Sequence, residues 1–269
     1  MRYFVILAFP LLLLFACSGS KHSSNSPVSA YNIVIDGKLW SSLFEQKAAE
    51  YRALCLQAYN IARLRLDEAL LQPSSKPRAI ITDIDETFLD NSPFSVHQAL
   101  QGKDYEVAAW AEWTAKAMAD TLTGALSFYN YAASRNVEIF YITNRRESEK
   151  DGTLQNLRRF HFPLADEQHL ILRKDVSSKE SRRQQVAATH EIVLFLGDNL
   201  ADFSSLFDGP KTTAERAAGV QQLSLEFGKR FIVLPNTNYG GWEDAIYGNN
   251  FSLTPQQKDS AIKNNLKAY

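Results

Sequence analysis

The sequence predicts an α/β protein in which helices cover both faces of a doubly wound, mainly parallel sheet. Five short apolar runs lack the polar alternation of half-exposed strands, which is typical of strands buried on both faces. Segments of helical character separate these runs along the chain, as expected of a parallel sheet. The predicted strands are residues 79–82, 137–142, 169–172, 192–196 and 231–234.

Composition places the chain among ordinary globular proteins. Its 269 residues, 45% of them hydrophobic and 22% charged, are enough to bury a full core. The formal net charge is −1, and no basic block or stripe is present, so the sequence does not favour binding to a nucleic acid polymer. We expect a small-molecule substrate instead.

The N-terminus is predicted to be a lipoprotein signal peptide over residues 1–16. Arg2 precedes an apolar run that ends at Ala16, and this run is too short to span a bilayer comfortably. The sequence LFAC, which ends at Cys17, resembles a bacterial lipobox, so Cys17 is the expected lipidation site. The alternative is an ordinary secretory signal whose cysteine has no role. Lipidation predicts a protein attached to the membrane of the bacterial cell envelope, because several acyl chains give durable anchoring.

Between the anchor and the folded domain, residues 17–30 are polar and rich in serine, which predicts a flexible tether. The folded domain is expected over residues 31–269. Its first element is a helix over residues 40–71, where apolar side chains recur at helical spacing. Ser41 or Ser42 is the expected cap at the start of this helix.

Further helices are expected at residues 123–134 and 178–188. The segment 91–122 is longer than a simple loop and is predicted to form a small helical cap over the site. It contains Trp110 and Trp113, which we expect to be core residues.

Polar residues follow four of the predicted strands. The carboxyl ends of parallel strands meet at one edge of a sheet, where ligands bind. Each of these residues also has a structural explanation, as a helix cap, a turn residue or a solvated lysine. Together, clustered carboxylates suit a cation, while a lysine, a hydroxyl and an amide suit a phosphate. The residues are Asp83, Asp85, Thr143, Asn144, Lys179, Asp198 and Asp202.

The motifs DIDET, TNR, SSK and GDNLADF, in this order, resemble the four motifs of the haloacid dehalogenase superfamily. Within it, ITDIDETFLDNSPF paired with IVLFLGDNLADF resembles the bacterial class C acid phosphatases with four signature aspartates. GKRFIVLPNTNYGGWE and WAEW are also similar to that family. The resemblance covers residues 33–242 and implies a Rossmann-like fold with a small cap, a location at the outer membrane and a homodimer.

The resemblance implies that Mg²⁺ is held by Asp83, Asp198 and the backbone carbonyl of Asp85. Asp202 would support the ion from nearby, through water. Asp83 would also be the nucleophile that forms an aspartyl-phosphate. Such an attack requires that nearby cations, namely the metal ion and Lys179, offset the repulsion between the carboxylate and the phosphate.

The resemblance also implies that Asp85 protonates the leaving alcohol and then deprotonates the attacking water. Neighbouring side chains at a strand end point in different directions, so that one acid can face phosphorus and the other the leaving group. This role predicts an acidic pH optimum. Thr143 and Asn144 would hydrogen-bond the phosphoryl oxygens.

Two aromatic residues, Phe94 and Tyr239, are expected either to stack on a substrate ring or to belong to the core. Stacking would favour 5′-nucleotides or aryl phosphates, the kind of substrate that the resemblance implies. Phe94 stands where the family usually has a tyrosine, so a contact made by that hydroxyl is absent here.

The leading hypothesis is therefore a metal-dependent acid phosphomonoesterase. One alternative is a phosphotransferase that uses an alcohol instead of water, which the sequence does not distinguish from a hydrolase. Another is a binding or storage lipoprotein without turnover. Retention of Asp83, Asp85, Lys179 and Asp198 favours the enzyme over the storage protein.

Overall fold

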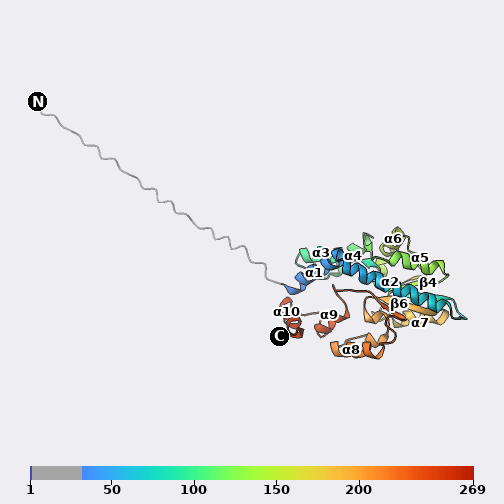
Figure 1. Cartoon of the computed structure of the whole chain (residues 1–269). Helices are drawn as coiled ribbons and strands as arrows, with labels where there is room; N and C mark the ends of the chain where they lie inside the picture. The colour runs from blue at the N-terminus through green and yellow to red at the C-terminus, as the bar shows by residue number, and fades with distance from the viewer. Residues whose placement is uncertain (2–31) are drawn as a thin grey trace. The chain divides into compact units, whose positions relative to one another are not determined.

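The computed structural model describes residue 1 and residues 32–269, and the latter form one compact unit (Figure 1). The predicted lipidation site at Cys17 and the predicted tether lie outside the described residues, as does the predicted signal peptide apart from Met1. Among the helices of the described part of the chain, none combines the length and apolar character needed to cross a bilayer.

The centre of the unit is a five-stranded sheet, as predicted. Its strands follow the order β5-β4-β1-β6-β7, and every neighbouring pair is parallel. The bounds agree with the predicted runs to within a few residues, except that β4 continues further, beyond a shift in its pairing with β5. The strands are β1 (Arg78–Thr82), β4 (Glu138–Arg146), β5 (Leu170–Arg173), β6 (Glu191–Gly197) and β7 (Phe231–Val233).

Helices cover both faces of this sheet because successive strand side chains point to opposite sides. In β1, Ile80 belongs to one apolar cluster, whereas Ala79 and Ile81 belong to another. The Ile80 cluster includes side chains from three helices, and the second cluster includes Val186 of α7. The helices are α2 (Ala49–Leu70), α5 (Ala125–Ser134) and α6 (Lys150–Arg159) on the first face, and α7 (Glu180–Thr189) on the second.

The N-terminal helix differs from the prediction. It is divided into α1 (Ile33–Lys47) and α2, because Ala48 has an extended backbone. The expected cap at Ser41 or Ser42 is wrong, since both serines lie inside α1. The cap is Asn32, whose side-chain oxygen accepts hydrogen bonds from two backbone N–H groups of the first turn.

The segment 91–122 contains two helices, α3 (Ser92–Leu100) and α4 (Val107–Ala115), as expected. The short strand β2 (Leu89–Asp90), just before this segment, pairs antiparallel with β3 (Asp120–Thr121), near the end of the segment. The sequence pattern does not predict these strands, because two residues are too few to show strand alternation.

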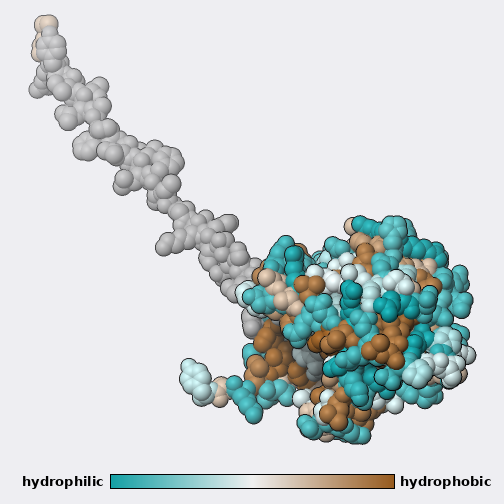
Figure 2. Space-filling view, turned by 45° about the vertical axis from the view of Figure 1, so that its right-hand side comes forward, coloured by the Kyte–Doolittle hydropathy of each residue, from teal (hydrophilic) through white to brown (hydrophobic). Residues whose placement is uncertain are grey.

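The remaining elements lie mostly in the C-terminal part of the chain. Figure 1 shows α9 and α10 near α1, at the opposite end of the sequence. The face in Figure 2 is largely hydrophilic, with separate hydrophobic patches. These elements are η1 (Glu147–Glu149), η2 (Leu200–Asp202), η3 (Ser205–Phe207), α8 (Thr213–Gln222), α9 (Gly241–Ile246) and α10 (Pro255–Asn265).

The strand order explains where a ligand can bind. From β1 the chain builds β4 and β5 on one side, and it then returns to build β6 and β7 on the other. In such sheets a crevice opens beyond the carboxyl ends of the strands at this reversal. The crevice is therefore expected next to the end of β1, which Asp83 follows directly.

Candidate active site

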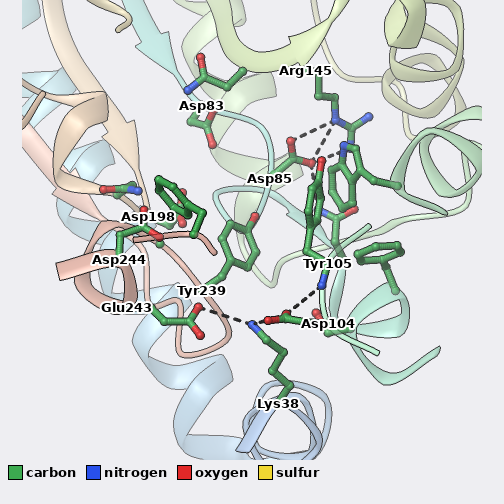
Figure 3. A pocket seen from close by; sticks show the side chains of 18 of the residues that line it. Lys38, Asp83, Asp85, Asp104, Tyr105, Arg145, Asp198, Tyr239, Glu243 and Asp244 are labelled. Carbon is green, nitrogen blue, oxygen red and sulfur yellow. Dashed lines mark hydrogen bonds and ion pairs between the residues drawn. The ribbon is translucent and has the colours of Figure 1, made fainter. Parts of the chain in front are cut away.

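Two aspartates follow β1 and line one cavity of about 550 Å³ (Figure 3). Ile84, which separates them, is completely buried in the main core, so Asp83 and Asp85 are turned toward the cavity. The N–H of Asp83 donates a hydrogen bond of 2.9 Å to the carbonyl oxygen of Leu196 in β6. This bond fixes the end of β1 against the strand that supplies the other acids.

Three carboxylates converge beside the end of β1. Asp83, Asp198 and Asp202 each offer an oxygen atom, and these atoms lie within 4.8 Å of one another. The Nζ atom of Lys179 lies 2.7 Å from Oδ1 of Asp202 and also contacts Oδ1 of Asp83. The predicted lysine and three of the predicted acids therefore form one cluster.

The charge of this cluster favours a cation. Burial raises the pKa of Asp83 to about 7 against the lowering effect of Lys179, and the charges of Asp202 and Asp85 add to the rise. Burial also raises the pKa of Asp198, as do the charges of Asp202 and Asp83. The single positive charge of Lys179 thus does not offset the negative charge of the three carboxylates. Oxygen donors alone suit a hard divalent ion such as Mg²⁺, so the residues present fit the implied metal.

The loops after β6 and β7 position two of the clustered carboxylates, Asp202 and Asp198. The Asn199 N–H donates a hydrogen bond of 3.0 Å to Oδ2 of Asp202, which bends this side chain back over Gly197. Any Cβ atom at Gly197 would lie less than 3.0 Å from Asp202. Asn236 donates a hydrogen bond of 2.7 Å from Nδ2 to Oδ2 of Asp198.

Asp85 has different partners from Asp83. Arg145 donates to it from Nη2 at 2.6 Å and from Nε at 3.1 Å, while Asn91 donates from Nδ2 at 2.9 Å. Trp113 in turn donates from its indole nitrogen to Oδ1 of Asn91 at 2.8 Å. Figure 3 shows Asp85 directed toward Arg145, away from Asp198. The two neighbouring acids thus have different cationic partners, Lys179 for Asp83 and Arg145 for Asp85.

The two residues predicted to bind phosphate differ in their access to the cavity. Asn144 is exposed and lines the cavity, and its Oδ1 accepts a hydrogen bond of 2.8 Å from Nη2 of Arg182. Thr143 is 1% exposed and is not among the cavity-lining residues that the structure describes. Its Oγ1 accepts a hydrogen bond of 3.1 Å from the Arg145 N–H.

Aromatic side chains form another part of the cavity wall. Phe94 and Tyr239 line it, as the stacking hypothesis requires, and Tyr105 and Trp110 lie there too. The ring of Trp110 meets the ring of Phe94 edge-on, with 5.0 Å between centroids. The prediction that Trp110 is a core residue is wrong, because α4 presents it to the cavity. The prediction for Trp113 is confirmed, since it packs against the main core.

Charged residues from distant parts of the sequence surround the opposite end of the cavity (Figure 3). The Nζ atom of Lys38 in α1 lies 3.5 Å from carboxylate oxygens of both Asp104 and Glu243. Lys258 of α10 lies 2.8 Å from Asp104. Burial would raise the pKa of Asp104, but Lys38 and Lys258 hold it below its ordinary value. Sequence reasoning missed these residues because no local pattern connects them.

Sequence reasoning also assigned no role to Glu86 or Arg145, although the DIDET and TNR motifs contain them. Glu86 is 3% exposed, accepts a hydrogen bond of 2.9 Å from the Asn91 N–H and contacts the hydroxyl of Tyr239. Burial and the charge of Asp85 raise the pKa of Glu86. Its position inside the motif was the available signal.

Carboxylates and a lysine meet at the end of the central strand of a doubly wound sheet. Together they form a phosphate-processing site of the haloacid dehalogenase type. Comparison with known proteins agrees. Residues 27–242 match the family described as HAD superfamily, subfamily IIIB (acid phosphatase), so the chain belongs to this family and is an acid phosphatase. This confirms both the resemblance and the enzyme class that the sequence predicted.

Solved structures point to the same class. The chain is similar to the class C acid phosphatase from Bacillus anthracis with tungstate bound, at 39% identity and a TM-score of 0.84, over 89% of this chain and 100% of that chain. It is also similar to another structure of the class C acid phosphatase from that organism, at 40% identity and a TM-score of 0.84, over 88% of this chain and 99% of that chain.

Proposed function

We propose that this acid phosphatase hydrolyses small phosphate monoesters, such as 5′-nucleotides or aryl phosphates, with the help of a divalent metal ion. The observation that carries this proposal is the convergence of Asp83, Asp198 and Asp202 around Lys179, with Asp85 in the same cavity. It supplies a nucleophile, cation ligands and a separate acid within one small space.

The metal ion that we propose is Mg²⁺. Asp83, Asp198 and the backbone carbonyl of Asp85 would hold it, with Asp202 supporting it from nearby. When bound, the ion neutralises negative charge on the phosphoryl group and so lowers the repulsion that the attacking carboxylate meets. Lys179 adds a positive charge on the same side, since it already contacts Asp83 and Asp202.

In the first step, a carboxylate oxygen of Asp83 attacks phosphorus, and the bond between phosphorus and the ester oxygen breaks. Asp85 gives its proton to the leaving oxygen, which departs as the alcohol. In the second step, water attacks phosphorus in the aspartyl-phosphate while Asp85 takes up a proton from that water. The bond between phosphorus and the Asp83 oxygen breaks, which releases phosphate and restores both carboxyl groups.

Asn144 and Lys179 are the proposed ligands of the phosphoryl oxygens. Because Oδ1 of Asn144 accepts from Arg182, the NH₂ group of Asn144 is directed to donate elsewhere. A hydrogen bond from Thr143 to the phosphoryl group stays a prediction. One related structure is described with tungstate bound, and tungstate is a tetrahedral oxyanion like phosphate, which supports an oxyanion in this cavity.

Phe94 and Tyr239 are the proposed contacts for the ring of a nucleoside or aryl group, because both line the cavity. Stacking of a ring on such side chains favours aromatic phosphate monoesters. We also propose that Cys17 is lipidated, that the anchor lies in the outer membrane and that two chains associate as a homodimer.

The activity is tested by release of p-nitrophenol from its phosphate at about pH 5–6, the acidic range in which general-acid catalysis by a carboxyl group is favoured. We expect activity with Mg²⁺, loss with a chelator and a fall of at least about 10³-fold in Asp83→Asn, because the nucleophile is removed. Asp151→Asn, at an exposed aspartate of α6, is the matched control and should stay active.

Chelator-resistant hydrolysis, or full activity in Asp83→Asn, would contradict the proposal. Adding excess alcohol tests the alternative of a phosphotransferase, which would yield a phosphorylated alcohol in place of free phosphate.

A further inference from the structure

Two arginines lie side by side at the carboxyl edge of the sheet. Arg146 ends β4 and Arg173 ends β5, and the parallel pairing places them opposite each other in register. Neighbouring strands are about 4.8 Å apart, so the two side chains start from adjacent positions. Both residues line the cavity that contains Asp83.

Neither of these guanidinium groups has a hydrogen bond or an ion pair within residues 32–269. Other arginines around the site are paired: Arg145 donates to Asp85, and Arg182 donates to Asn144. Two adjacent unpaired cations repel each other, and an oxyanion between them would offset that repulsion. Guanidinium groups suit this task because they bind carboxylate or phosphate through two parallel hydrogen bonds.

The same wall of the cavity holds an acceptor that lacks a donor. Oε2 of Glu149 accepts a hydrogen bond of 2.7 Å from the backbone N–H of Arg146. Oε1 is buried and has no hydrogen-bond partner among residues 32–269, and the whole residue is only 6% exposed. Buried polar atoms are normally satisfied, so this atom is available to accept a hydrogen bond from a donor that enters the cavity.

The pKa of Tyr105, which also lines the cavity, responds to the charges of Glu149, Arg146 and Arg173. Burial raises the pKa of Tyr105, the charge of Glu149 adds to the rise, and Arg146 and Arg173 act in the opposite direction. All three charged groups therefore act on one hydroxyl at the cavity surface.

We propose that Arg146 and Arg173 form a second anion-binding subsite for the substrate whose ester phosphate lies at Asp83. This inference rests on the proposed function and names its substrate class: phosphate monoesters with a second oxyanion group, either phosphate or carboxylate. Glu149 would accept a hydrogen bond from a hydroxyl beside that group.

The test compares kcat/KM within two matched pairs of substrates. One pair is AMP and adenosine 3′,5′-bisphosphate, scored at the 5′-phosphate, and the other is phenyl phosphate and 4-carboxyphenyl phosphate. We expect the more anionic member of at least one pair to be preferred by roughly tenfold, the worth of one charge-assisted hydrogen bond. Arg146→Gln and Arg173→Gln should each bring that preference close to one. Lys174→Gln, at an exposed neighbour that does not line the cavity, is the control and should keep it.

No preference in either pair, or a preference that survives in both arginine variants, would overturn the subsite. Preference in one pair alone identifies the group as phosphate or carboxylate. Hydrolysis of phenyl phosphate reports separately on the proposed function. The subsite is also tested without turnover by calorimetric binding of adenosine 3′,5′-bisphosphate and AMP to Asp83→Asn, which lacks the proposed nucleophile but keeps both arginines, and equal dissociation constants would again contradict it.

Discussion

The two aspartates after β1 are like charges close together in the sequence, and single residues around them offset their repulsion. Asp83 and Asp85 are close in sequence and both face the cavity, yet each has its own cation. Lys179 contacts Asp83, whereas Arg145 pairs with Asp85. Ile84 makes this separation possible, because its burial in the core fixes the turn between them. The two acids therefore have the separate surroundings that their proposed roles require, which are attack on phosphorus for Asp83 and proton transfer for Asp85.

Gly197 provides a test at this scale. In Gly197→Ala the added methyl group would overlap the Asp202 side chain, which lies less than 3.0 Å from the Cβ position. We expect phosphatase activity to fall and the free energy of unfolding to decrease by about 1–3 kcal/mol, the usual cost of overpacking. Activity assays and urea unfolding measure the two effects.

The matched control for this variant is Gly37→Ala, because nothing lies within 4 Å of a Cβ atom at that position in α1. It should retain activity and gain up to about 1 kcal/mol from helix propensity. Normal activity in Gly197→Ala would show that phosphatase activity does not require the Asp202 side chain to lie against Gly197.

At the scale of elements, α1 supports the loop after β7. Glu45 accepts hydrogen bonds from the backbone N–H and the hydroxyl of Thr237, and it also contacts Nδ2 of Asn238. The same loop carries Asn236, which donates to Asp198, and Tyr239, which lines the cavity. A helix near the start of the domain thus positions site residues near its end.

Glu45 also predicts a dependence of stability on pH. Burial raises its pKa, while hydrogen bonds from Thr237 and Asn238 act in the opposite direction. The folded chain therefore keeps Glu45 protonated at pH values above its unfolded pKa of about 4.3. The contribution of Glu45 to the free energy of unfolding falls as the pH rises from that value through the raised pKa of the folded chain. Glu45→Gln removes this titration.

We expect Glu45→Gln to be less stable than the parent chain by about 1 kcal/mol near pH 5, because the amide has one acceptor oxygen instead of two. The gap should narrow near pH 8, where the parent carries a buried charge. Urea unfolding at both values measures it. A gap that widens as pH rises would contradict the raised pKa.

At the scale of the whole molecule, the cavity joins residues that are far apart in the chain. Lys38 comes from α1, Asp83 directly follows the central strand β1 and Lys258 comes from α10, yet all three line it. Residues 32–269 form one compact unit by themselves. Activity therefore depends on this unit, whereas the proposed anchoring depends on residues before it.

Replacing Cys17 by serine separates these two properties. Serine does not accept the lipid, so we expect Cys17→Ser to leave the membrane fraction while its phosphatase activity stays within about twofold of the parent, as is usual for a change outside the folded unit. Cell fractionation followed by the activity assay measures both. Unchanged retention in the membrane fraction would contradict a lipid anchor at this cysteine.

The sequence by itself determined the strands of the sheet, the helical segment 91–122 and the acids and lysine that meet beyond the strand ends. These follow from local hydrophobic patterns and from the rule that parallel strands end at one edge. Only the tertiary structure decided the break at Ala48, the exposure of Trp110 to the cavity and the partners of each acid. Arg145 with Asp85, Glu45 with Asn238 and Arg146 beside Arg173 are contacts between distant segments. Such contacts depend on packing between elements, which no local pattern specifies.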